Sequence, residues 1–195
     1  MKSVLISIKP EWCDLIREGK KTVEVRKTRP KLQPPFKAYI YCTKGDSHFS
    51  EGDRFCLYAP PHDTPIMANQ SVIGEFVCNC ITGLNANNMV QAYFNNTQNT
   101  CLTDEEIKTY ANGKKLYYWH ISDLKIYDKP KYLGKFIVPA NVGCCNEGKC
   151  RGCRYFLPGS AVAGIEPDCL ADFNTDEYKP LRRAPQDWCY VKEVG

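Results

Sequence analysis

The stretch GKKTVEVR, residues 19–26, joins a glycine to a short run in which apolar and polar side chains alternate. Gly19 supplies a residue type that commonly ends a helix. Val23 and Val25 alternate with polar neighbours, which is the period of a strand with one buried face and one polar face. The stretch therefore predicts a helix end followed by a half-buried strand over 22–26.

The residues before this stretch predict a strand and a helix. VLISIK over 3–8 is a continuous apolar run of strand length. Pro10 follows it, and proline is tolerated at the first position of a helix because no N–H is needed there. Apolar side chains then recur from Trp12 at helical spacing, so we expect a helix over about 10–18.

The remainder of the chain reads as short strands with little helix. Thr103 and Glu106 form a capping box that predicts one further short helix. Glu75 lies in an apolar run and shares the predicted strand face with Ile73, so its carboxylate is expected to point to the interior. No regular alternation of strands and helices is present, which favours an α+β fold built on a small β-barrel with two or three short helices. The further strands are predicted over 37–43, 54–58, 71–81, 115–121, 124–127, 135–139 and 188–191, with a loop over 60–65.

Charge and hydropathy narrow the class of protein. The 195 residues contain no apolar run of the ~18 residues needed to span a membrane. The first apolar run, over 3–8, is too short for the apolar core of a signal peptide. A cytoplasmic location is therefore expected. Residues 17–31 contain seven Lys or Arg and two Glu, so this segment has a net charge of +5 in a chain of net +4. Such a segment suits an anionic partner such as nucleic acid, and it equally suits a solvated helix end and strand.

Composition changes near Ala140. We therefore expect a barrel domain over 1–140 and a Cys-rich extension over 141–195 that packs on the barrel. Cysteine clusters in a reducing compartment indicate metal before disulfide. The C-x-x-C spacing of Cys150 and Cys153 matches a zinc knuckle, with Cys145 (or Cys144) and Cys169 as the remaining ligands of a structural zinc site. The same cysteines could instead hold an iron–sulfur cluster, form a redox dithiol or remain free thiols.

The pattern G-x-K-x-x-E-x-R at 19–26, placed after a strand and a helix and followed by Gly74-Glu75 in an apolar strand, resembles the ASCH family of the PUA-like superfamily. Two further segments, 119–136 and 184–191, resemble parts of ASCH proteins associated with phages and prophages. The resemblance covers about residues 1–140. It implies a PUA-like β-barrel that binds single-stranded RNA or a modified nucleotide.

A nucleic-acid site is expected around the motif. Lys21 and Arg26, with Lys20, can neutralise phosphate. Tyr41, next to Tyr39 on the predicted strand and near Lys44, offers a ring on which a base could stack. A purely structural role is also open, in which Glu24 and Arg26 form an ion pair and the tyrosines line the core.

The resemblance also implies an alternative, enzymatic function. ASCH-like amidohydrolases that deacetylate 4-acetylcytidine use a Lys, a Thr three residues later and a Glu on a later strand. Lys21 and Glu75 match two of these positions, whereas Glu24 stands where the hydroxyl is expected. The hydrolase hypothesis therefore makes Lys21, Glu24 and Glu75 the catalytic candidates, with Lys21 and Glu75 as an acid–base pair. A ribonuclease activity and a role as a protein-interaction module also stay open, although the three histidines have no spacing that unites them.

Overall fold

The computed structural model describes residues 3–45, 55–59, 62–84, 99–139 and 178–194, and every structural statement below concerns these residues. Their elements, in chain order, are β1 (Ser3–Ile8), α1 (Pro10–Arg17), β2 (Val23–Arg26), β3 (Phe36–Cys42), β4 (Cys56–Ala59), β5 (His62–Met67), β6 (Ser71–Leu84), α3 (Asp104–Ala111), β7 (Leu116–Lys131), the 3₁₀ turn η3 (Leu133–Lys135), β8 (Phe136–Pro139), β9 (Tyr178–Pro180) and β10 (Trp188–Glu193).

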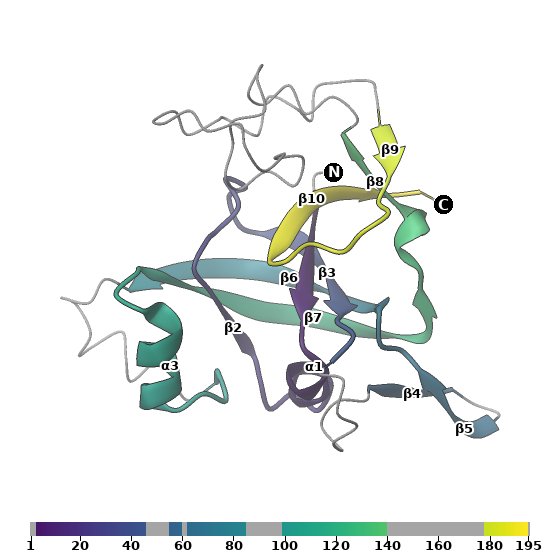
Figure 1. The fold of residues 1–195 in the computed structure, drawn as a ribbon, viewed down its shortest axis with the longest axis horizontal. Helices are drawn as coiled ribbons and strands as arrows, with labels where there is room; N and C mark the ends of the chain where they lie inside the picture. Colours follow the sequence, from purple (N-terminus) through teal and green to yellow (C-terminus); the bar gives the residue numbers. More distant parts are fainter. Residues whose placement is uncertain (1–2, 46–54, 60–61, 85–98, 140–177, 195) are drawn as a thin grey trace.

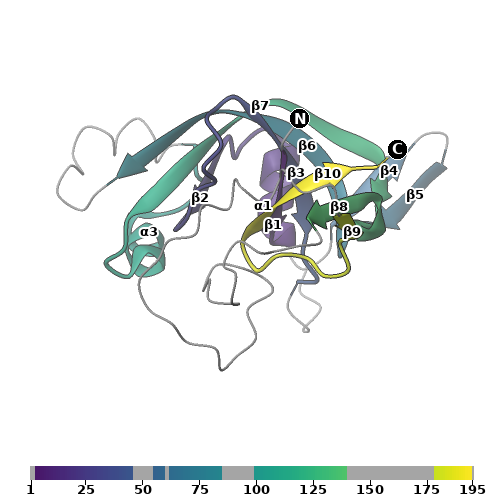
Figure 2. The same ribbon diagram turned by 90° about the horizontal axis from the view of Figure 1, so that it is seen from above.

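One sheet dominates this part of the chain. Its strands are ordered β2-β7-β6-β3-β1-β10-β8-β9, and β4 and β5 form a separate ribbon. β1 runs parallel to β3 and antiparallel to β10, which comes from the other end of the chain. Figures 1 and 2 show β6 and β7 arching across the molecule as two long neighbouring strands, with β1 and α1 beneath the arch.

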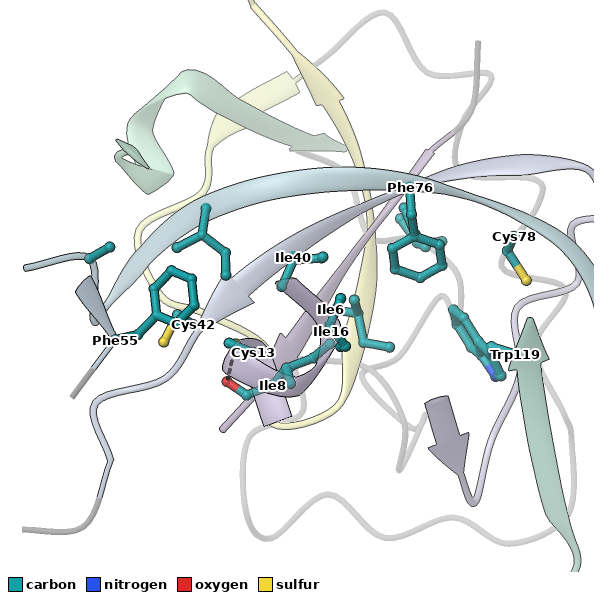
Figure 3. Close-up of a cluster of buried hydrophobic side chains, with 14 of the residues drawn as sticks. Ile6, Ile8, Cys13, Ile16, Ile40, Cys42, Phe55, Phe76, Cys78 and Trp119 are labelled. Carbon is teal, nitrogen blue, oxygen red and sulfur yellow. Dashed lines mark hydrogen bonds between the residues drawn. The ribbon is translucent and has the colours of Figure 1, made fainter. Parts of the chain in front are cut away.

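The largest apolar cluster lies between the sheet and α1. Ile6 and Ile40 from the central strands and Ile16 from α1 are almost fully buried in it, and Trp119 lies at the end away from Phe55 (Figure 3). A second cluster on other faces of the same strands contains Leu5, Tyr39, Val72, Tyr127 and Phe136. Adjacent residues of β1 and β3 thus serve different clusters, as the strand period requires.

The helix ends are set by local sequence. α1 begins at Pro10 and ends before Gly19, whose φ of +72° is readily adopted by glycine. The backbone N–H groups of Lys20 and Lys21 both donate to the carbonyl of Leu15, which turns the chain from α1 into β2. In α3, Thr103 and Glu106 form the capping box that the sequence predicts.

The α+β fold predicted from the sequence is confirmed, and most expected strands are present within two or three residues of their predicted bounds. Two local predictions are wrong. The segment predicted as a loop over 60–65 overlaps β5, and the strands predicted over 115–121 and 124–127 form the single strand β7, which passes through Asp123 at a φ of +47°.

The C-terminal residues form part of the sheet itself. β10 lies between β1 and β8, and β9 forms an outer edge beyond β8. The segment from 141 onward, expected to pack on the barrel as an extension, therefore contributes two strands to the barrel sheet. No helix among the described residues is long and apolar enough to span a bilayer.

Candidate functional site

Lys21 lies at the junction of α1 and β2 with its ammonium group buried. Its Nζ donates to the carbonyl of Thr100 at 2.7 Å and lies 3.4 Å from a carboxylate oxygen of Glu24. The same nitrogen lies 5.2 Å from the centre of the Trp12 ring, within range of a cation–π interaction. Only 2% of the side chain is exposed, so the lysine cannot reach a phosphate in solution in this conformation.

Arg26 is the second cation bound to Glu24. Its Nη2 lies 2.9 Å from the other Glu24 oxygen and donates to the carbonyl of Ser7 at 2.6 Å, while Nη1 lies 2.8 Å from Asp187. Burial acts to lower the pKa of Arg26, but the Glu24 and Asp187 carboxylates outweigh burial and the pKa is raised. The Glu24–Arg26 ion pair considered from the sequence is therefore present, and it joins a network of four charged side chains.

This network closes the sheet on itself. β2 is an edge strand whose only described strand partner is β7, yet Arg26 from β2 reaches Ser7 at the end of β1 and Asp187 just before β10. The Thr28 hydroxyl donates to Asp187 at 2.6 Å and accepts from the Trp188 indole N–H at 2.8 Å. We call this line of side-chain contacts between β2 and the β1–β10 pair the seam.

All three tryptophans of the chain gather along the seam. Trp119 lies opposite Glu24 in the β2–β7 register and is completely buried. The ring of Trp188 lies 6.1 Å from that of Trp119, and Trp12 lies beside Lys21. The polar network is thus bordered by three indole rings, of which Trp12 and Trp188 are partly exposed.

Two loops held together by the seam carry exposed positive charge. The loop after β2 and the loop before β10 are tied by the contacts of Thr28 with Asp187 and Trp188 and by a hydrogen bond from the Lys31 N–H to the Tyr190 hydroxyl. We call residues 27–31 and 182–188 the basic loop pair. Its Lys27 is half-buried and its other four basic side chains are exposed, namely Arg29, Lys31, Arg182 and Arg183.

Glu75 does not join Lys21, so the expected acid–base pair needs correction. Its carboxylate accepts from Tyr127 at 2.6 Å and from Lys37 at 3.0 Å, and it belongs to the sheet face that holds the second apolar cluster. Burial acts to raise the pKa of Glu75, but the hydrogen bonds from Tyr127 and Lys37 outweigh it and the pKa is lowered. Ile73, which was expected to share a face with Glu75, packs instead in the α1-side cluster.

A β-bulge explains this reversal. The β3–β6 register shifts between Ile40 and Tyr41, which leaves Ile73 as an extra residue between Val72 and Gly74. An extra residue inverts the alternation on one side of the bulge. Gly74 is required there because a Cβ would lie 2.5 Å from the Lys125 carbonyl oxygen of the neighbouring strand.

The other predicted nucleic-acid residues are scattered. Lys20 is exposed and paired with Glu18 at 2.7 Å, and Lys44 is exposed at the end of β3. Tyr41 is only 7% exposed and packs in the second apolar cluster, as does Tyr39. Their predicted role in stacking needs correction, because neither ring presents an accessible face. These tyrosines line the core instead, which is the structural role considered from the sequence.

The predicted metal ligands Cys145, Cys150, Cys153 and Cys169 all lie outside the described residues, so the zinc site stays a prediction. Across 3–45, 55–59, 62–84, 99–139 and 178–194, no group of three or more His, Cys, Asp or Glu side chains is arranged to hold a metal ion. Among the histidines, His120 is half-buried against the Thr82 hydroxyl, and burial lowers its pKa.

The residues that complete the charged network around Glu24 are not evident from the sequence. Asp187, Trp188 and Ser7 come from the two ends of the chain, and Asp187 is 161 positions from Arg26. Their contacts follow from the pairing of β1 with β10, which no local pattern shows. The one signal in the sequence was the similarity of segment 184–191 to proteins that share the motif.

Comparison with known proteins gives a family and several similar structures, two of which are described here. The family model of the ASCH domain matches residues 6–138. The structure of ASCH from Zymomonas mobilis is 23% identical, covers 67% of this chain and 73% of its own, and has a TM-score of 0.47. The N-terminal domain of Staphylothermus marinus McrB is 10% identical, covers 67% of this chain and 76% of its own, and has a TM-score of 0.38. No curated protein matches the sequence.

Proposed function

Residues 6–138 make this chain a member of the ASCH domain family, and from that premise we propose that it binds single-stranded RNA across the basic loop pair. The observation that supports the proposal is the clustering of exposed cations on two loops fixed to each other by the seam. Asp187, the acidic residue within the loop pair, already faces Arg26. Exposed cations such as Arg29 and Arg182 can therefore face phosphates.

Rings next to these cations can contribute stacking. Trp188 and Tyr190 are partly exposed and pack edge to face at 5.3 Å, and Arg29 lies 5.8 Å from the Tyr117 ring. Base–aromatic stacking is worth ~1–3 kcal/mol per base and tolerates any base. This arrangement of charge and rings replaces Tyr41 and Tyr39, the rings expected from the sequence.

Neutralising phosphates makes the affinity depend on salt. For single strands the slope of log affinity against log salt is about −0.7 per phosphate contacted. With ~3–5 contacts the affinity should fall roughly 20- to 130-fold between 50 and 200 mM salt. A modified nucleotide bound without its neighbours would show a much weaker dependence.

The test is fluorescence anisotropy with a short labelled single-stranded RNA at both salt concentrations. The variant R29A/R182A removes one exposed cation from each loop, and K125A/K129A removes the same charge from exposed positions on β7. We expect the loop variant to weaken binding at least 10-fold and to reduce the salt slope by ~1.4, with the control close to wild type. Equal affinities for the two variants would refute the proposed interface.

The hydrolase hypothesis receives no comparable support from the geometry. Its proposed acid–base pair is divided between two faces of the sheet, and Lys21 is enclosed by Glu24, Thr100 and Trp12. Binding is therefore the function that the described residues favour.

A further inference from the structure

We propose that the seam recognises the hydrogen-bond acceptor edge of one nucleobase through two N–H groups, Nε of Arg26 and Nε1 of Trp119. The inference rests on the proposed RNA binding and adds a specific contact to it. Electrostatic contact with the basic loop pair would be independent of sequence. A base held in the seam would add recognition of a ring.

The two N–H groups are the only buried side-chain nitrogen or oxygen atoms of the described residues that have no hydrogen-bond partner. Leaving a buried donor unpaired is costly, and such groups are rare in native proteins. The other nitrogens of Arg26 all have acceptors, so its Nε stands out within an otherwise satisfied side chain. The two donors come from the neighbouring strands β2 and β7: Trp119 is directly opposite Glu24, and Arg26 is two residues along β2 from Glu24, on the same face of the strand.

The charge of the network selects a neutral ligand. Lys21 and Arg26 are balanced by Glu24 and Asp187, so the four side chains sum to zero. A phosphate placed among them would have no uncompensated cation to face. A carbonyl oxygen or a ring nitrogen of a base accepts a hydrogen bond without bringing charge into a buried site.

The rings beside the donors select a planar ligand. Trp119 and Trp188 lie 6.1 Å apart with their planes 55° from each other, a separation at which aromatic rings interact. Trp188 is partly exposed, and its indole nitrogen is held by Thr28, which is itself exposed. To admit the base, the Trp188 ring gives up its hydrogen bond to Thr28, moves and then stacks on the base. No strand pairing between β2 and β10 among the described residues opposes this movement.

The chain offers a direct spectroscopic test because its three tryptophans all lie at the seam. In a ¹H–¹⁵N spectrum of the wild-type protein they give three indole cross-peaks, which the variants W12F and W188F assign. Guanosine, cytidine and inorganic phosphate are added separately, followed by the labelled RNA used for anisotropy. We expect the Trp119 cross-peak to move downfield, saturably, with a nucleoside and with RNA, and to stay in place with phosphate.

A Trp119 cross-peak that does not move at saturating RNA overturns the inference. The two proposals fail separately: RNA that binds by anisotropy while Trp119 is unaffected leaves the basic loop pair standing without base recognition. If a nucleoside moves the Trp119 cross-peak but R29A/R182A binds RNA like its control, base recognition at the seam is supported and the basic loop pair is refuted as the RNA interface. A shift with phosphate alone would show that the site takes an anion, and it would also overturn the inference.

A matched pair of variants gives the magnitude. W119F removes the donor and keeps a ring, whereas Y132F removes an exposed hydroxyl donor between β7 and η3, outside the seam. We expect W119F to weaken RNA binding about fivefold to tenfold, the effect of one hydrogen bond, and Y132F to leave it unchanged. Equal binding by both variants counts against the inference, and the wild-type spectra decide the matter if W119F does not fold.

Discussion

Replacing Glu24 by glutamine should destabilise the protein more than any exposed charge substitution. The glutamine has the same shape, so the change removes charge without opening a cavity. In the wild-type protein the Glu24 carboxylate lies between Lys21 and Arg26, whose side chains are 2% and 10% exposed. Both cations stay buried in E24Q, and each loses a counter-charge.

The expected loss in the free energy of unfolding depends on which partners Lys21 and Arg26 retain in E24Q. Arg26 retains Asp187 and the Ser7 carbonyl, whereas Lys21 retains only the Thr100 carbonyl and the Trp12 ring among its described contacts. Removing one partner of a buried ion pair typically costs about 3–5 kcal/mol. Because Arg26 is still paired, we expect a loss near the lower end, about 3 kcal/mol.

Urea unfolding followed by tryptophan fluorescence measures this loss. With a slope of about 2–3 kcal/mol per molar urea, the midpoint should fall by roughly 1–1.5 M. The control is E18Q, which removes the exposed partner of Lys20 and should leave the midpoint where it is. A midpoint for E24Q that matches E18Q would refute the reasoning that the buried network stabilises the seam.

Two further predictions concern single titrating groups. Hydrogen bonds from Tyr127 and Lys37 hold the pKa of Glu75 below its ordinary 4.5 despite burial, so its stabilising contribution is full above that pH and disappears as the pH falls through the lower folded value. E75Q should therefore flatten the loss of stability between about pH 5 and pH 3 in urea titrations, and an unchanged acid limb would contradict this. Cys80 is exposed, whereas burial raises the pKa of Cys78 to about 12. Iodoacetamide at pH 8 should therefore alkylate Cys80 faster than Cys78, as followed by peptide mapping. Equal rates for the two cysteines would show that Cys78 is accessible.

The elements that the sequence predicted well are those with local causes. The strand over 3–8, the helix that begins at Pro10 and the capping box at Thr103 depend on neighbours within about four residues. The face of Glu75 was predicted wrongly for an equally local reason, because the extra residue Ile73 inverts the alternation and no composition rule marks that bulge. The merging of two predicted strands into β7 is a similar case, since Asp123 at positive φ adjusts the strand without ending it.

The residues that complete the site from distant parts of the chain were harder to predict than the motif residues at its centre. The sequence identified Lys21, Glu24 and Arg26, since their spacing on one short segment is visible in one dimension. Asp187 and Trp188 join them only after β10 has paired with β1, which requires both ends of the chain to be placed. A partner separated by most of the chain leaves no periodic signal, so only the folded topology shows it.

The arrangement of charge separates attraction from recognition, and this separation can be measured. The four charges of the network, three buried and Asp187 partly exposed, sum to zero, so the field that attracts a polyanion comes from the exposed cations of the basic loop pair, such as Arg29 and Arg182. Changing those cations alters the number of counterions released and therefore the slope of affinity against salt. Changing Trp119 alters a neutral hydrogen bond, so W119F should weaken RNA binding by the same factor at 50 and 200 mM salt. A salt slope that changes in W119F as it does in R29A/R182A would mean that the indole acts through the phosphate contacts, and attraction and recognition would then be one site.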